Sequence, residues 1–86
     1  MNIKKSTRKN KKYMVKYNGK WIHFGDKRYQ QYKDTTPLRI YSNLDHLDKK
    51  RRYRYRARAS KIKNKQGEYT YKNPKYANYY AYKFLW

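Results

Sequence analysis

Two short runs near the beginning of the chain are rich in aromatic and β-branched residues. They occupy residues 12–17 and 20–24, and Asn18-Gly19 separates them. Both turn residues tolerate the positive φ angles of a type I′ turn, which joins paired antiparallel strands. Gly25-Asp26 would end the second run. We therefore predict a β-hairpin over residues 12–24.

The pattern is weaker in residues 26–41. Tyr29 and Tyr32 are three positions apart, which favours a short helical turn with both rings on one side. Pro37 would end such a turn, because the residue before a proline avoids the helical region. The Leu-Arg-Ile-Tyr run at residues 38–41 is typical of a short strand or an extended segment.

Residues 42–62 have the spacing of a helix. Ser42 followed by Asp45 fits a capping box. Several positions then recur at helical intervals: Leu44, Leu47, Arg51, Tyr55 and Ile62. Residues 52–59 also alternate with period two, and as a strand they would place four arginines on one face. Helix is favoured because Ala, Arg and Lys are strong helix formers and no turn signal interrupts the run.

The last part of the chain predicts a turn at residues 63–67, a short strand at 68–71 and a second helix. Asn73-Pro74 is typical of a helix beginning. We expect a short amphipathic helix over residues 74–85. One stripe of this helix would contain Tyr76, Tyr79, Tyr80, Lys83 and Phe84.

Together these elements predict a small single α+β domain over residues 13–86: an N-terminal β-hairpin, a basic helix and a short C-terminal aromatic helix. Residues 1–12 are basic and contain too little apolar surface to pack, so we expect them to be a flexible, disordered arm. The expected core combines the hairpin with Tyr29, Tyr32, Leu44, Leu47, Tyr76, Tyr80, Phe84 and Trp86.

Composition adds a strong charge to this picture. The 86 residues contain 25 Lys and Arg against 5 Asp and Glu, for a formal net charge of +20. Such a field attracts phosphate polymers and anionic surfaces. Aliphatic residues are few, but 13 Tyr and 2 Trp can supply ring surface to a small core. An AT-rich genome would also raise the Tyr count together with Lys and Asn. We expect a marginal fold that gains stability from its partner.

The densest basic cluster lies in the first predicted helix, where Arg51, Arg54 and Arg58 would fall close to one line. Arginine matches phosphate oxygens with a planar fork of donors. Nothing in the cluster indicates base-edge recognition, so we expect binding without sequence specificity. The predicted nucleic-acid contacts are Lys11, Lys12, Lys49, Lys50, Arg51, Arg52, Arg54, Arg56, Arg58, Lys61 and Tyr53.

The tyrosines within this cluster have two interpretations. Tyr53 and Tyr55 lie between arginines, a composition used to stack on bases of single strands. Alternatively they pack against the rest of the domain, and we favour this interpretation for Tyr55 because it shares a stripe with Leu44 and Leu47.

Catalysis is not expected. The two histidines are His23 and His46, and the His-x-Asp-x-x-Arg spacing from His46 to Arg51 could in principle polarise a phosphate. A nuclease normally needs several converging metal ligands, whereas the nearby acids are explained by helix capping. We interpret His46 as a structural hydrogen-bonding residue and His23 as a packing residue. The chain has no cysteine, and we predict no metal, no cofactor and no small-molecule substrate.

A membrane partner is not expected either. No apolar run approaches the roughly 18 residues of a membrane span. The basic helix lacks a wide apolar face for insertion, and the Phe-Leu-Trp run at residues 84–86 would be a weak anchor.

Three motifs, over residues 13–86, carry a resemblance. They are His23-Phe24-Gly25 followed by Tyr29, Tyr32 and Asp34; His46, Asp48, Arg51, Tyr55 and Arg58 in an H-x-D-x-x-R-x-x-x-Y-x-x-R run; and the final Leu85-Trp86. In this order and spacing, the chain resembles a family of small basic uncharacterised proteins of giant nucleocytoplasmic large DNA viruses. Two positions depart from that pattern: Ala59 replaces a histidine and Lys49 replaces a proline.

The resemblance implies a viral protein located in the virion, and in the host cytoplasm or nucleus during assembly. It implies no activity. We therefore expect a virion-associated protein that binds nucleic acid, DNA in preference to RNA. One alternative is a minor capsid or virion structural protein that contacts other virion proteins. A second alternative is an RNA- or ribosome-associated protein.

Overall fold

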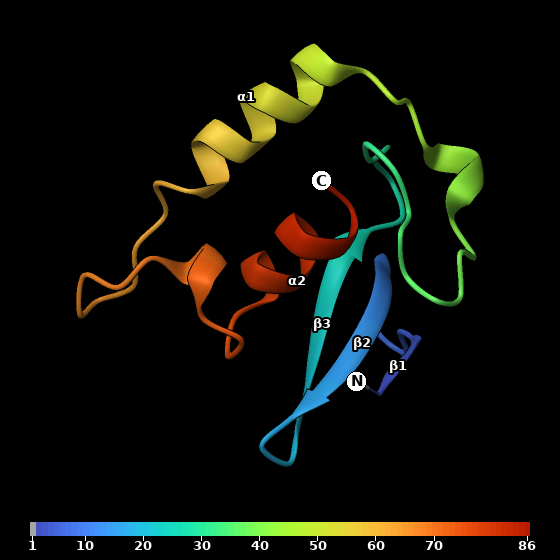
Figure 1. Ribbon diagram of the computed structural model, residues 1–86. Coiled ribbons are helices and arrows are strands. Elements are labelled where there is room, and N and C mark those ends of the chain that lie inside the picture. The colour runs from blue at the N-terminus through green and yellow to red at the C-terminus, as the bar shows by residue number, and fades with distance from the viewer. Residues whose placement is uncertain (1) are drawn as a thin grey trace.

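The computed structural model describes residues 2–86, and it has a small antiparallel sheet followed by two helices (Figure 1). The strands are ordered β1-β2-β3 in the sheet. The elements are β1 (Ile3–Lys5), β2 (Lys11–Tyr17), β3 (Lys20–Asp26), the 3-10 turn η1 (Ser42–Leu44), α1 (Lys49–Ala59), the 3-10 turn η2 (Thr70–Lys72) and α2 (Ala77–Phe84). The predicted α+β class is confirmed.

The hairpin forms where the sequence predicts it. Tyr17 pairs with Lys20 across the turn, and Asn18 and Gly19 have φ angles of 49° and 77°. Two successive positive φ angles are those of a type I′ turn, whose twist matches that of the strands. The local turn chemistry therefore sets the register of β2 against β3.

Residues 2–12 of the predicted arm are not disordered in the structure, and Met1 lies outside the described residues. Residues 3–5 form β1, which pairs antiparallel with β2 so that Ile3 lies opposite Val15. The free edge of a hairpin offers unpaired backbone groups to any neighbouring segment. Ile3 also packs against the core, so backbone pairing and one apolar contact order a segment whose own composition favours disorder.

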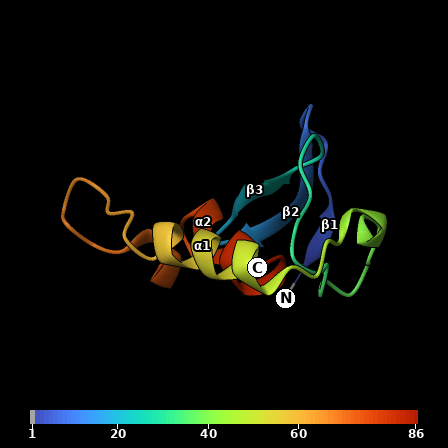
Figure 2. The same cartoon turned by 90° about the horizontal axis from the view of Figure 1, so that it is seen from above.

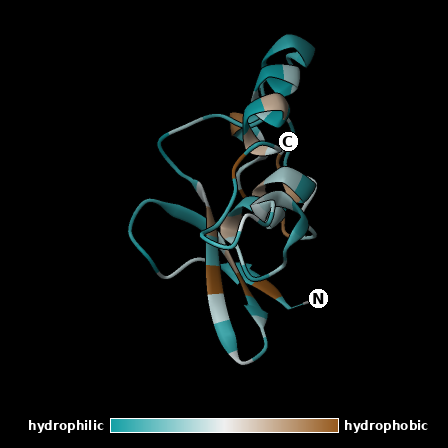
Figure 3. Cartoon of the chain, turned by 90° about the vertical axis from the view of Figure 1, so that its left-hand side faces the viewer, coloured by the Kyte–Doolittle hydropathy of each residue, from teal (hydrophilic) through white to brown (hydrophobic). Residues whose placement is uncertain are grey.

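The core lies between the sheet and α2. The sheet contributes Tyr13, Val15 and Phe24, and the C-terminal segment contributes Tyr80, Ala81 and Leu85. Figure 1 shows α2 lying across β3. In Figure 3, hydrophobic colour gathers on the strands and the C-terminal segment, whereas α1 is mainly hydrophilic.

The predicted core was partly right. Tyr80 is fully buried, and Phe84 and Trp86 pack partly buried against the core. Tyr29 and Leu47, however, are 64% and 58% exposed. Both belong to loops whose path is set by polar contacts. Neither residue lies in a helix, so the helical spacing that placed them in the core does not apply.

A buried polar network orders residues 29–45. The Asp34 carboxylate accepts hydrogen bonds from the Tyr13 hydroxyl and from the backbone N–H of Tyr41. Asp45 accepts from the Gln31 amide and from the Asp34 N–H. Burial and the bond to Asp34 raise the pKa of Tyr13 to about 12. This network replaces the predicted helical turn at Tyr29 and Tyr32. It also replaces the short strand or extended segment predicted at residues 38–41, where Arg39 has a φ of 48°.

Helix α1 is shorter than the predicted helix over residues 42–62. Leu47 has a φ of 57°, a left-handed conformation that interrupts any helix running through it. Asp48 is the N-cap, and its carboxylate accepts from the N–H groups of Lys50 and Arg51. The predicted capping box at Ser42 is wrong because the Asp45 carboxylate is used by the polar network instead.

The segment between the helices is largely irregular. An isolated bridge pairs Lys63 with Tyr69, and η2 follows where a strand was predicted at residues 68–71. Figure 2 shows the orange loop before η2 projecting from the rest of the chain. The second predicted helix is confirmed as α2, which begins at Ala77.

Candidate nucleic-acid interface

Helix α1 is held to the domain along one side only. The Tyr55 ring stacks on the Trp86 ring with centroids 4.2 Å apart and planes within 8°. Arg52 Nε donates to the main-chain oxygen of Trp86 at 2.7 Å, and the Arg56 guanidinium lies 3.9 Å from the centre of the Tyr82 ring. Ala59 is the one buried residue of α1. The helix therefore has two accessible flanks.

One flank of α1 forms a cationic groove. A turn of about 3.6 residues brings Arg51, Arg54 and Arg58 to the same side, as their spacing predicted. They line a cavity of about 520 Å³ with the Tyr55–Trp86 stack. The opposite wall includes Tyr29 and Gln30, and Arg51 Nη1 donates to the Gln30 side-chain oxygen at 2.8 Å. We call this the arginine groove.

The floor of the arginine groove is the junction between β3 and the C-terminal segment. Gly25, Ala81 and Leu85 contribute to its lining. Gly25 has a φ of 76°, and a methyl group there would lie 2.9 Å from Leu85 Cδ1 and 3.0 Å from Lys12 Cδ. A glycine is required because the backbone is left-handed and closely packed.

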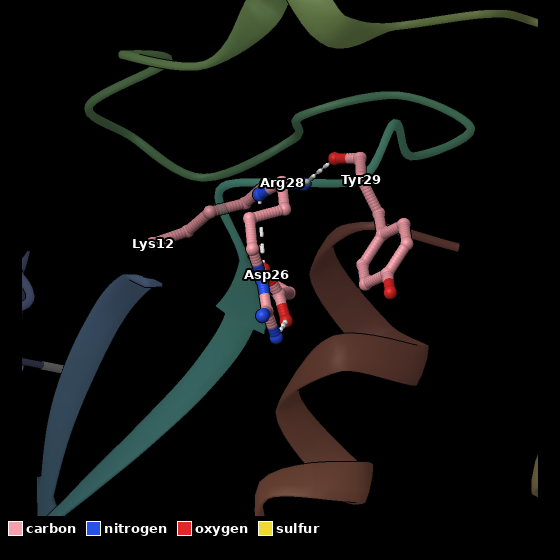
Figure 4. A network of polar contacts seen from close by, with 4 residues as sticks. All are labelled: Lys12, Asp26, Arg28 and Tyr29. Atoms are coloured by element: carbon pink, nitrogen blue, oxygen red, sulfur yellow. Dashed lines mark hydrogen bonds and ion pairs between the residues drawn. The ribbon is translucent and has the colours of Figure 1, made fainter. Parts of the chain in front are cut away.

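Lys12 was predicted to contact phosphate, and the structure contradicts this. Its side chain is 2% exposed, although it lines part of the arginine groove. The ammonium donates to the Tyr29 carbonyl at 2.9 Å and to the Gln31 side-chain oxygen. Burial lowers the pKa of Lys12 to about 8. Figure 4 shows this side chain beside Tyr29 and the neighbouring Asp26–Arg28 pair.

The other predicted contacts divide by accessibility. Lys49, Lys50, Tyr53 and Lys61 are exposed on α1 or just beyond it, as are the three arginines of the groove. Arg52 and Arg56 are half-buried against aromatic rings, with the Arg52 guanidinium 4.8 Å from the centre of the Tyr32 ring. Lys11 is half-buried in β2 opposite Asp26 and does not line the arginine groove.

All five acidic side chains form internal contacts. Asp26 pairs with Arg28 at 2.8 Å, the one side-chain ion pair within residues 2–86. Hydrogen bonds from Arg28 lower the pKa of Asp26 to about 2. The other acids accept hydrogen bonds from backbone, amide or hydroxyl groups: Asp34 and Asp45 in the polar network, Asp48 at the N-cap and Glu68 with Asn64. The large positive charge is therefore left almost uncompensated.

The histidines have structural partners. His46 Nδ1 accepts from the Asp48 N–H at 2.8 Å, and its ring centroid lies 5.2 Å from that of Trp86. His23 Nδ1 lies 2.7 Å from Ser6 Oγ. Burial lowers the pKa of each imidazole. Within residues 2–86, no three carboxylate or imidazole side chains gather as metal ligands would.

The sequence does not predict the wall opposite the arginines. Tyr29 is exposed rather than part of the core, and Gln30 had no predicted role. Trp86 packs against the core as predicted, but its stack with Tyr55 beneath α1 was not predicted. The one available signal was the Leu-Trp run at the end of the chain, because a tryptophan so close to a helix needs a large surface to cover it.

Comparison with known proteins gives one match. Residues 1–44 match a family of unknown function, DUF5754. The chain belongs to the DUF5754 family. No curated protein and no solved structure matches it. The DUF5754 match covers the sheet, Tyr29 and Gln30, whereas Arg51, Arg54 and Arg58 lie beyond it.

Neither α1 nor α2, nor any other helix in residues 2–86, combines the length and apolarity needed to cross a bilayer.

Proposed function

We propose that this protein binds nucleic acid, DNA in preference to RNA, through phosphate contacts that do not depend on base sequence. The observation that carries the proposal is the arginine groove. Three arginines face one cavity, and the one acid in its lining, Asp26, is already paired with Arg28. Because no carboxylate in residues 2–86 forms an ion pair with these three arginines, their charge is available to an external polyanion.

The dimensions of α1 suit a phosphate backbone. Arg51 and Arg58 are seven residues apart, so their Cα atoms are separated by roughly 10 Å along the helix axis. Phosphates of one DNA strand recur at roughly 3.4 Å along its axis. The three arginines are therefore spread over a length that covers a few neighbouring phosphates of one strand.

Lack of sequence specificity follows from the residue types in the groove. Base edges are commonly identified by Asn, Gln or Arg side chains held in fixed bidentate geometry. The amide side chain in the arginine groove is that of Gln30, whose oxygen accepts from Arg51. Within residues 2–86, no hydrogen bond or ion pair fixes the side chains of Arg54 and Arg58. The groove therefore offers cations for phosphate and little fixed geometry for base recognition.

Association with a virion is a further part of this proposal. It is supported by the resemblance to small basic proteins of giant DNA viruses, which includes His46, Asp48, Arg51, Tyr55 and Arg58. Three of these residues line the arginine groove.

A second candidate is a structural protein that contacts other virion proteins. The observation that favours it is the exposure of apolar side chains on residues 38–47: Leu38 and Ile40 are each 43% exposed, and Leu47 is 58% exposed. Apolar side chains accessible on a small domain suit contact with another protein. Such a protein would remain with the capsid shell after the DNA is removed.

The proposed function is tested by measuring wild-type binding to two duplex DNAs of unrelated sequence across a salt series. We expect equal affinities that fall steeply as salt rises. Duplex RNA is the competitor. Stronger competition by RNA would favour the RNA-associated alternative, and weak DNA binding at physiological salt would favour a protein partner.

A further inference from the structure

The second flank of α1 has a different chemistry from the first. Tyr53 and Arg56 lie on this flank, and Tyr82 of α2 faces it across a cavity of about 670 Å³. Lys49 and Lys61 line the same cavity. A second cavity of about 490 Å³ shares Arg56 and Tyr82 and is also lined by Tyr71, Lys72, Tyr79 and Lys83. We call the two cavities together the tyrosine groove.

Cations and rings are paired throughout the tyrosine groove. The Arg56 guanidinium lies 3.9 Å from the Tyr82 ring centre, and Lys83 Nζ lies 5.6 Å from that of Tyr79. Tyr71 and Tyr82 are in contact, with ring centroids 4.9 Å apart. These rings are therefore held in place before any ligand arrives.

Tyr53 is the exception, because its ring is 76% exposed. Within residues 2–86 it has no aromatic or cationic stacking partner. It stands beside Lys49 and Lys61 in the lining of one cavity. An accessible ring that shares a cavity with two lysines offers one surface for a flat aromatic ligand and two charges for its neighbouring phosphates.

We propose that the tyrosine groove binds single-stranded nucleic acid, with an unpaired base stacked on Tyr53 and the backbone phosphates held by the surrounding lysines and Arg56. Proteins that bind single strands combine these two components, a cationic track and aromatic stacking surfaces. A duplex cannot use the site in this way, because its base faces are covered by neighbouring pairs. The inference rests on the proposed nucleic-acid function. It adds a site for single-stranded nucleic acid on the other flank of α1 from the one proposed to bind a duplex.

The two flanks lie on different sides of α1. With about 100° between successive residues, Tyr53 and Arg56 project roughly 140–160° away from Arg51 and Arg58, and Tyr53 projects about 100° away from Arg54. The side of the helix between them is occupied by Tyr55 and Ala59, which pack on the domain. One molecule can therefore contact duplex and single-stranded segments without one blocking the other.

The experiment compares Tyr53→Leu with wild type on three ligands: an oligothymidylate, an abasic oligomer of the same length, and a duplex. We expect Tyr53→Leu to weaken oligothymidylate binding about fivefold or more. Binding to the abasic oligomer and to the duplex should be unchanged. The salt slope should also be unchanged, because the variant removes no cation.

Tyr53→Phe is the matched control, since it keeps the ring and should retain wild-type affinity for oligothymidylate. Because the side chain is exposed, both variants should unfold at the wild-type temperature. Equal losses on the thymidylate and abasic oligomers, or no loss on either, would overturn the inference while leaving duplex binding intact. Failure of the wild-type protein to bind any of the three ligands would instead overturn the proposed function.

Discussion

Replacing Gly25 by alanine tests how closely β3 packs on the C-terminal segment. The added methyl group would lie 2.9 Å from Leu85 Cδ1 and 3.0 Å from Lys12 Cδ. Both neighbours have little room to move, because Leu85 is 1% exposed and the Lys12 ammonium is bonded to the Tyr29 carbonyl. The strain must therefore be absorbed within the core or by separating α2 from the sheet.

Three contributions determine the expected change in the free energy of unfolding. The φ of 76° at Gly25 costs an alanine about 1–2 kcal/mol, and overpacking adds about 1–3 kcal/mol. The smaller entropy of the unfolded alanine chain returns about 0.4–1 kcal/mol. We therefore expect Gly25→Ala to lower the free energy of unfolding by about 1–4.5 kcal/mol.

Gly19→Ala is the matched control. Gly19 has nearly the same φ, 77°, but an added methyl group would meet nothing within 4 Å. In this variant only the strain of the left-handed backbone should lower the free energy of unfolding, by about 1 kcal/mol. Urea unfolding of the two variants and wild type gives the comparison. Equal losses for the two variants would refute the close packing of Gly25 against Leu85 and Lys12.

Two further predictions concern the support of α1 and the buried lysine. Trp86→Leu removes the ring that stacks beneath Tyr55. We expect the free energy of unfolding to fall by about 1–2 kcal/mol and the amide hydrogens of α1 to exchange faster. Unchanged exchange would show that the stack does not hold the helix. Burial lowers the pKa of Lys12 from 10.5 to about 8, so the unfolded chain binds the Lys12 proton more tightly than the folded chain does. The free energy of unfolding should therefore rise by roughly 2 kcal/mol between pH 7 and 10. Above pH 10 the raised pKa of Tyr13 acts in the opposite direction. Urea unfolding at each pH should show that the free energy of unfolding rises clearly less in Lys12→Met than in wild type. Parallel pH profiles for the two proteins would contradict a lowered pKa at Lys12.

Local chemistry made part of the fold predictable. The turn at Asn18-Gly19 is set by two adjacent residues, so the hairpin could be read directly from the sequence. The existence of α1 and the alignment of Arg51, Arg54 and Arg58 followed from helix formers at regular spacing. The left-handed Leu47 had no such local signal, and for that reason the beginning of α1 was placed too early.

Contacts between distant segments could not be predicted. Lys12 looks like any other basic residue in the sequence, and it is buried because residues 29–31 lie over it and accept its hydrogen bonds. The Asp34 and Asp45 carboxylates similarly find partners far along the chain. The arginine groove unites Gln30, Arg51 and Trp86, so its cationic flank was visible in the sequence but its opposite wall was not.

The most direct test of phosphate binding in the arginine groove compares two variants with equal net charge. Arg51, Arg54 and Arg58 are replaced by Gln in one variant, and the exposed Lys5, Lys20 and Lys65 in the other. The salt dependence of duplex DNA binding is measured for both. If the three arginines contact phosphates, their loss should reduce the slope of log K against log salt by about 2.7, and the lysine variant should keep a nearly wild-type slope. Equal slopes for the two variants would contradict a specific groove and leave only the overall charge as the source of binding.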